Sequence, residues 1–147
     1  MRRGQISIDF LFAVTLIAIL SLNLVYISSS QKTQAQNFDV TTKLKVFAVD
    51  VRDSVANVYA MGEGFKVKKS APFKLQTGDN LTVILNNVTN SIVVTGTIGG
   101  KEFYVMQRSP VPIYTQSKVV LTSDHSTFWI VTVYNATEGR LYVEVSP

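Results

Sequence analysis

Cysteine is absent from the 147 residues of the chain, and histidine occurs only once. The first absence excludes disulfides, thiolate nucleophiles and cysteine-based metal sites. The second argues against a zinc site, because such sites take several Cys, His or acidic ligands. His125 lies in the polar run 123–126, and we expect no catalytic triad there because neighbouring residues on a turn point in different directions. No metal site, cofactor or enzymatic activity is therefore expected.

Charged residues are also scarce, at 16% of the chain, whereas hydrophobic residues reach 46%. The formal net charge is +4, and the basic residues are scattered rather than interleaved with aromatic residues. We therefore expect no nucleic-acid partner. Most of the hydrophobic excess lies before residue 28, and the chain that follows has room for one domain.

The longest apolar run covers residues 10–27 and contains no charge. As a helix it would be about 27 Å long, close to the hydrocarbon thickness of a bilayer. Because it is apolar on every side, it needs lipid or protein around it. Arg2 and Arg3 precede the run and predict that this end stays cytoplasmic while the rest of the chain crosses the membrane. A plain signal anchor for an outside domain is one interpretation.

A second helical pattern follows over residues 38–61. Apolar residues recur there at spacings of three and four, which is one face of an α-helix: Val40, Leu44, Phe47, Val51, Val55 and Val58. Gly62 and Gly64 predict the end of the helix. Because no proline or glycine separates the two patterns, residues 5–62 are predicted to form one long helix, apolar at first and amphipathic later.

After the helix, the sequence changes to short β-branched and aromatic runs separated by turn residues. The strands are expected at residues 81–85, 92–95, 102–106, 118–122, 127–134 and 141–145. Gly99 and Gly100 predict a hairpin turn from Ile98 to Lys101. Six or seven strands at this spacing predict an antiparallel β-sandwich or barrel-like head over residues 63–147, with the amphipathic helix covering one sheet face. The predicted fold class is α+β.

Aromatic residues are frequent in the predicted head. Some of them could form an adhesive patch, but because one face of alternating strands must be core, most are expected in the core: Tyr104, Tyr114, Phe128, Trp129 and Tyr134.

Three asparagines match the N-glycosylation sequon, namely Asn80, Asn87 and Asn135. Each lies at or beside a predicted turn, in the part of the chain placed outside the membrane. N-linked glycans are accordingly expected on at least one of them. The alternative is that Asn and Thr occur there because they suit turns and strands.

The opening residues MRRGQISIDF place a cleavable-looking bond, Gly4–Gln5, before the apolar run rather than after it. Ser7 and Asp9 follow Gln5 at intervals of two residues, and Phe10 begins the apolar run. This pattern resembles the class III signal peptide of archaeal type IV pilin-like proteins. The resemblance covers residues 3–27, and Asp9 stands where the family usually has glutamate.

The resemblance implies that a prepilin peptidase removes residues 1–4, so that Gln5 becomes the N-terminus. Gln5, Ser7, Asp9 and Phe10 would then belong to an assembly segment. The family likeness implies that Asp9 pairs with the new α-amine of Gln5, on its own chain or a neighbour's, and sets the register between subunits. The local alternative is that Asp9 stabilises the N-terminus of its own helix through the dipole.

The resemblance therefore implies a pilin, a homopolymeric filament subunit at the archaeal cell surface, displayed for adhesion to a target of unknown chemistry. Before assembly the subunit would reside in the membrane, and an assembly platform would extract it. Two alternatives stay open. One is a membrane-anchored extracellular binding module that keeps residues 1–4 and never polymerises. The other is a subunit of an archaellum-like swimming filament.

Overall fold

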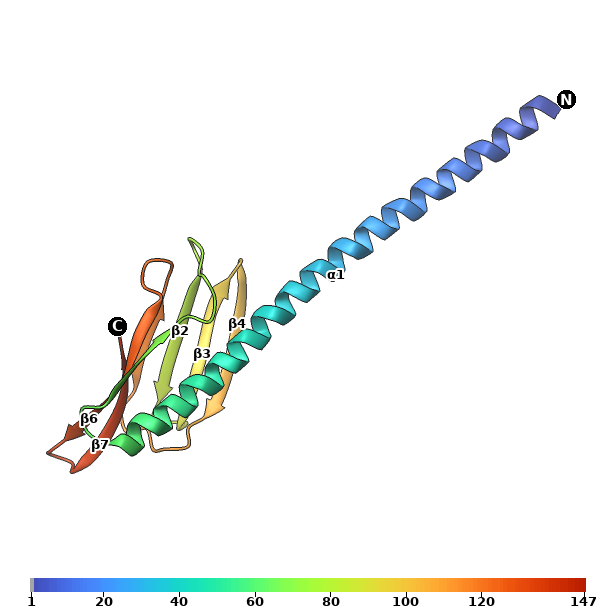
Figure 1. The fold of residues 1–147 in the computed structure, drawn as a ribbon. Coiled ribbons are helices and arrows are strands. Elements are labelled where there is room, and N and C mark those ends of the chain that lie inside the picture. Colours follow the sequence, from blue (N-terminus) through green and yellow to red (C-terminus); the bar gives the residue numbers. More distant parts are fainter. Residues whose placement is uncertain (1) are drawn as a thin grey trace. The chain divides into compact units, whose positions relative to one another are not determined.

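A computed structural model describes residues 2–147, with side chains from residue 8 onward. Within these residues one helix, α1 (Arg2–Met61), is followed by seven strands (Figure 1). The strands are β1 (Lys66–Ser70), β2 (Asn80–Asn86), β3 (Ser91–Ile98), β4 (Lys101–Arg108), β5 (Ser117–Leu121), β6 (Thr127–Asn135) and β7 (Arg140–Ser146). The chain divides into two compact units, Met1–Val40 and Thr41–Pro147. The predicted α+β fold class is confirmed.

The second half of α1 packs against both sheets and forms part of the core of the second unit. Its apolar face is fully buried: Leu44, Ala48, Val51, Val55 and Val58. Phe47 packs edge-to-face on Phe128 of β6, with the ring centroids 6.2 Å apart. Ser54 is also buried, and its hydroxyl donates to the Asp50 carbonyl at 2.7 Å, so no polar atom there lacks a partner. The predicted amphipathic face is thus confirmed.

The helix ends at the predicted glycines and is tied directly to β6. Gly62 and Gly64 have φ angles of +94° and +77°, a region that side chains disfavour. Gly62 N–H donates to the Val58 carbonyl at 3.2 Å. The Thr132 hydroxyl of β6 lies within hydrogen-bond distance of the Gly62 and Phe65 carbonyls. The Thr132 backbone adds two bonds, accepting from Gly64 N–H at 3.1 Å and donating to Phe65 at 3.0 Å.

The strands form two antiparallel sheets, one of three strands in the order β1-β6-β7 and one of four in the order β4-β3-β2-β5. The predicted glycine turn joins β3 to β4, with Ile98 opposite Lys101. The Ser117 hydroxyl of β5 accepts from the Val145 N–H of β7 at 3.0 Å, which links the neighbouring edges of the two sheets. This arrangement leaves β1 and β4 as the other edge strands.

Alternation along the strands separates a buried inner face from an outer face on each sheet. In the four-stranded sheet the inner residues include Leu81, Val83, Leu85, Ile92 and Val94, all fully buried. In the three-stranded sheet they include Phe128, Ile130, Val143 and Val145. The core therefore lies between these inner faces and the amphipathic half of α1.

Two sequence-based expectations need correction. Strand β1 was not among the predicted runs, because its five residues contain only one apolar side chain, Val67. The expectation that most aromatic residues are core is wrong. Phe128 is fully buried, whereas Tyr104 is 66% and Tyr134 is 44% exposed, and Tyr114 and Trp129 are half-buried. The register places Tyr104 and Trp129 on the outer faces of their sheets. The side chains alternate between the two faces as expected, but these two rings belong to the outer set rather than to the inner one.

Candidate functional site

Residues 8–27 of α1, called here the apolar segment, leave an unusually large apolar surface unburied. Their large apolar side chains range from 47% exposed at Val14 to 76% at Tyr26. From Ile8 onward, α1 is the one helix in the described part of the chain that is long and apolar enough to cross a membrane. Folded monomers rarely leave so large an apolar surface in water. The apolar segment therefore requires lipid or other protein around it.

Two polar side chains inside the apolar segment donate hydrogen bonds to the backbone of the same helix. The Thr15 hydroxyl donates to the Leu11 carbonyl at 2.8 Å. The Asn23 side-chain amide donates to the Ile19 carbonyl at 2.8 Å. Because these donors already have partners, transferring the segment to lipid or to a helix bundle leaves fewer unpaired polar groups. The sequence pattern alone did not reveal these contacts.

The predicted cleavage and assembly residues all lie within α1. Gly4, Gln5 and Ser7 belong to it by backbone, but their side chains lie outside those that the structure describes, so their roles stay predictions. Asp9 is exposed and Phe10 is 70% exposed. Gln5 and Asp9 are four residues apart on one helix, which places them on the same face. Asp9 lies about two turns into α1, beyond the first turn where a helix dipole acts on a carboxylate.

The three sequons differ in accessibility. Asn87 is exposed in the turn between β2 and β3, and the neighbouring Val88 is 85% exposed. Asn80 and Asn135 are half-buried. The Asn80 side-chain oxygen accepts from Thr97 N–H at 3.2 Å, and the Asn135 oxygen closes its own turn by accepting from Thr137 N–H at 3.0 Å. Glycosylation stays a prediction, and Asn87 is its most accessible acceptor.

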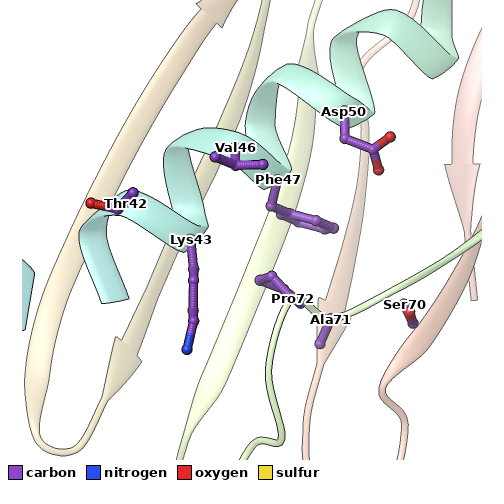
Figure 2. Close-up of a pocket in the computed structure, with 8 residues that line it drawn as sticks. All are labelled: Thr42, Lys43, Val46, Phe47, Asp50, Ser70, Ala71 and Pro72. Carbon is purple, nitrogen blue, oxygen red and sulfur yellow. The ribbon is translucent and has the colours of Figure 1, made fainter. Parts of the chain in front are cut away.

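A shallow pocket lies between α1 and the segment after β1 (Figure 2). Its lining residues are Thr42, Lys43, Val46, Phe47, Asp50, Ser70, Ala71 and Pro72. Phe47 lines the pocket from α1, and Pro72 lines it from the segment after β1 (Figure 2). The Asp50 carboxylate is already paired with Lys69 of β1, each oxygen lying 2.8 Å from the ammonium nitrogen. The pocket is therefore a packing feature beside an ion pair rather than a cluster of reactive groups.

The outer face of the three-stranded sheet combines aromatic and basic side chains. Its residues, by register, are Lys66, Lys68, Trp129, Val131, Val133, Arg140, Tyr142 and Glu144. The ammonium nitrogens of Lys66 and Lys68 lie 5.0 and 5.7 Å from the centroid of a Trp129 ring. Scattered basic residues in the sequence thus meet aromatic rings in the fold, which sequence patterning did not predict because the partners come from β1 and β6.

The second cation–aromatic contact on this side of the sheet involves Arg140. Its guanidinium carbon lies 5.1 Å from the centroid of the Tyr114 ring. Tyr114 in turn stacks on Tyr142, with centroids 5.8 Å apart and an angle of 34° between the rings. The Tyr142 hydroxyl donates to the Glu138 carboxylate, and this hydrogen bond raises the pKa of Tyr142 above its usual 10.0.

Among the described residues, no group of three or more His, Cys, Asp or Glu side chains is arranged to hold a metal ion. His125 is exposed near the end of β5, and its backbone N–H donates to the Thr122 hydroxyl at 3.3 Å. The expectation that the protein is not an enzyme stays a prediction.

No protein family, curated protein or solved structure matches the chain. The class of the protein is accordingly defined by its architecture. A long N-terminal helix with an exposed apolar segment precedes two antiparallel sheets, which is a pilin-like α+β architecture. This architecture fits a membrane-inserted or oligomerising chain.

Proposed function

We propose that the protein is a pilin, the structural subunit of an extracellular, archaeal type IV pilus-like filament. The observation that carries the proposal is the apolar segment, whose large side chains are exposed around the whole helix. A one-sided apolar stripe needs one neighbour, but an all-round apolar helix needs to be surrounded. The membrane supplies this environment before assembly, and the helices of other copies supply it afterwards.

The energetics favour a stable assembly. If bundling buried on the order of 1,500 Å2 per subunit, the hydrophobic term at about 25 cal/mol per Å2 would reach tens of kcal/mol before entropic losses. The contact between successive subunits is head-to-tail rather than self-complementary, so the product is an open helical filament. The Thr41–Pro147 unit remains outside the bundle as the displayed head, with adhesion as its proposed role.

Processing at the Gly4–Gln5 bond completes the proposal. Removal of residues 1–4 takes away Arg2 and Arg3, the charged end that holds the precursor at the cytoplasmic face. Extraction into the filament then no longer requires these charges to cross the membrane. Prepilin peptidase and an assembly platform are the partners that this route requires.

A second candidate function is a membrane-anchored module that does not polymerise. It is favoured by the same helix, because α1 passes the length and composition criteria for a single membrane span. The two candidates differ in whether residues 1–4 are retained and in whether copies of the apolar segment meet each other.

The deciding experiment is mass spectrometry of the N-terminus of protein sheared from its native cells. A product that begins at Gln5 and sediments in a high-speed filament pellet supports the pilin. A product that retains Met1 and is released only by detergent supports the anchored module and contradicts the pilin.

Asp9→Ala tests the register role of the carboxylate. The variant is expected to insert into membranes at the normal level but to yield fewer filaments, because the partner of the Gln5 α-amine is lost. Asp9→Glu is the matched control, since it keeps the charge and should restore the yield. Normal filament yield from Asp9→Ala would contradict this role.

A further inference from the structure

The Trp129 indole carries two ammonium groups on the outer face of the three-stranded sheet. Lys68 lies directly opposite Trp129 in the register, and Lys66 lies two residues away on the same strand. Both lysines are exposed, and their nitrogens lie 5.0 Å (Lys66) and 5.7 Å (Lys68) from a Trp129 ring centroid. Two like charges thus contact the same indole side chain, which favours an anionic ligand at this position.

Neither ammonium is neutralised within the part of the chain that the structure describes. Ion pairs there include those of Arg52 with Asp53 and of Lys69 with Asp50, and neither Lys66 nor Lys68 takes part in one. Lys69 is the informative comparison, because it lies on the same strand and has a carboxylate partner on α1. The two outward lysines of β1 are therefore available to a ligand, whereas the inward one is not.

We propose that this outer face binds acidic polysaccharide, with Lys66, Lys68 and Trp129 as the main contacts. A carboxylate that pairs with either ammonium group lies beside the indole, so the rest of the ligand meets the aromatic surface. A uronic acid provides both a carboxylate for the ammonium groups and an apolar surface for the indole, since its carboxylate is attached directly to a sugar ring with an apolar C–H face.

The same face extends far enough for an oligomeric ligand. Val133 lies four residues beyond Trp129 along β6, about 13 Å at the usual strand rise, and its partner on β7 is Tyr142. Tyr142 stacks with Tyr114, which is in turn contacted by Arg140. A second cation–aromatic contact therefore lies along the strands from the first, so a short oligosaccharide can reach both.

The charge on this face favours polysaccharide over nucleic acid. Three cations, Lys66, Lys68 and Arg140, share the region with the Glu144 and Glu138 carboxylates, so the net local charge is small. Nucleic-acid binding depends on neutralising many phosphates, and this face has too few cations for it. Recognition here rests on close contact between an aromatic ring, two ammonium groups and one ligand carboxylate at a time.

The site lies wholly within the Thr41–Pro147 unit and does not depend on polymerisation. A filament would display many copies, so weak single-site binding would become strong attachment through multivalency. Failure of the binding test would leave the proposed pilin function untouched, and failure of the filament test would leave this site in place.

The test uses the only tryptophan of the chain, Trp129, as its reporter. Full-length protein in detergent is titrated with a hexamer of mannuronic acid while tryptophan emission and heat are recorded together. Neutral maltohexaose serves as the uncharged comparison, and hexathymidylate as the polyphosphate comparison. We expect a saturable emission change with the acidic sugar only, and weakening as salt is added.

The Lys66→Gln/Lys68→Gln double variant should weaken hexamannuronate binding by about tenfold, because it removes two exposed charge contacts with the ligand. Lys74→Gln/Lys118→Gln is the matched control, since both lysines are exposed elsewhere on the same unit and the charge change is identical. Unchanged thermal unfolding of both double variants establishes that the fold is intact.

Any of four outcomes would overturn the proposal. One is the absence of both heat and emission change with hexamannuronate. The second is heat without an emission change, and the third is equal weakening in the two double variants; either result places binding elsewhere. The fourth is equally tight binding of hexathymidylate, which would make the surface a general polyanion site.

Discussion

The two halves of α1 are both rich in apolar residues, but they differ in whether the rest of the chain buries those residues. In the apolar segment, every large apolar side chain from residue 8 to residue 27 is at least 47% exposed. In the second half, most large apolar residues lie on one face, and from Leu44 to Val58 the residues of that face are at most 5% exposed. A one-sided stripe finds its partner within its own chain, whereas an all-round apolar helix depends on partners outside it.

The largest effect is expected from a charge placed in the buried face of α1. Val55 is fully buried, so Val55→Asp would bury a carboxylate without a partner and destabilise the fold by more than about 4 kcal/mol. Val46→Asp is the matched control on the same helix, because Val46 is 65% exposed, and should change stability by less than about 0.5 kcal/mol. Urea unfolding followed by Trp129 fluorescence measures both, and equal stability of the two variants would contradict the assignment of the faces.

The complementary substitution lies in the apolar segment. Leu16 is 62% exposed, so Leu16→Asp should leave urea unfolding of the head unchanged while adding an insertion penalty of about 2.5–3.5 kcal/mol. The protein should therefore be lost from membrane and filament fractions, as judged by quantitative immunoblotting. Leu16→Val should behave as wild type. If Leu16→Asp lowered the stability of the head as much as Val55→Asp does, the conclusion that only the second half of α1 belongs to the core of the head would be contradicted.

A smaller effect is expected within the head at Gly96. A Cβ atom there would lie 2.1 Å from the Asn80 carbonyl oxygen and 2.9 Å from Leu81 Cα, so β2 must shift. Gly96→Ala should destabilise the head by about 1–3 kcal/mol without removing the protein from membranes. Thr97→Ala, at the next position of β3, should cost less in the same urea titration. Wild-type stability of Gly96→Ala would show that the two strands are less closely packed.

The smallest effect concerns the titration of Tyr142. Because the Glu138 carboxylate accepts its hydroxyl proton, the pKa of Tyr142 in the fold lies above the usual 10.0. The stabilising contribution of this hydrogen bond is therefore complete below pH 10 and is lost as pH rises through the folded pKa. Glu138→Gln should lower the pKa of Tyr142, as followed by tyrosinate absorbance.

Tyr142→Phe identifies the Tyr142 transition among the tyrosines of the chain. Leu16→Asp should leave this titration unchanged, because Tyr142 and Glu138 both lie in the Thr41–Pro147 unit. An identical titration in Glu138→Gln and wild type would contradict the assigned cause.

Local sequence patterns predicted the elements that depend on local chemistry. The spacing of Leu44, Val51 and Val58 specified the buried face of α1, and the glycines after Met61 specified its end. The turn from Ile98 to Lys101 followed from two adjacent glycines. In each case the physical cause lies within a few residues of the feature, so the sequence displays it directly.

Features that depend on distant pairing were not predictable in the same way. Strand β1 is held by β6, and its lysine-rich sequence resembles a loop when read alone. Edge strands commonly carry lysine, because it discourages pairing with other chains. The contact of Lys66 and Lys68 with Trp129 requires this same pairing. The outward position of Tyr104 likewise depends on the strand register. Alternation alone does not determine which of two neighbouring residues faces the core.

The junction between α1 and β6 has a mechanical consequence. The helix end is attached through Thr132, and β6 is the central strand of its sheet. Tension applied along the helix would therefore reach the central strand β6 through these hydrogen bonds, besides passing along the backbone into the edge strand β1. A pull on the helix would then load the bonds at Thr132 and the β1–β6 ladder together, so the edge strand is not loaded alone.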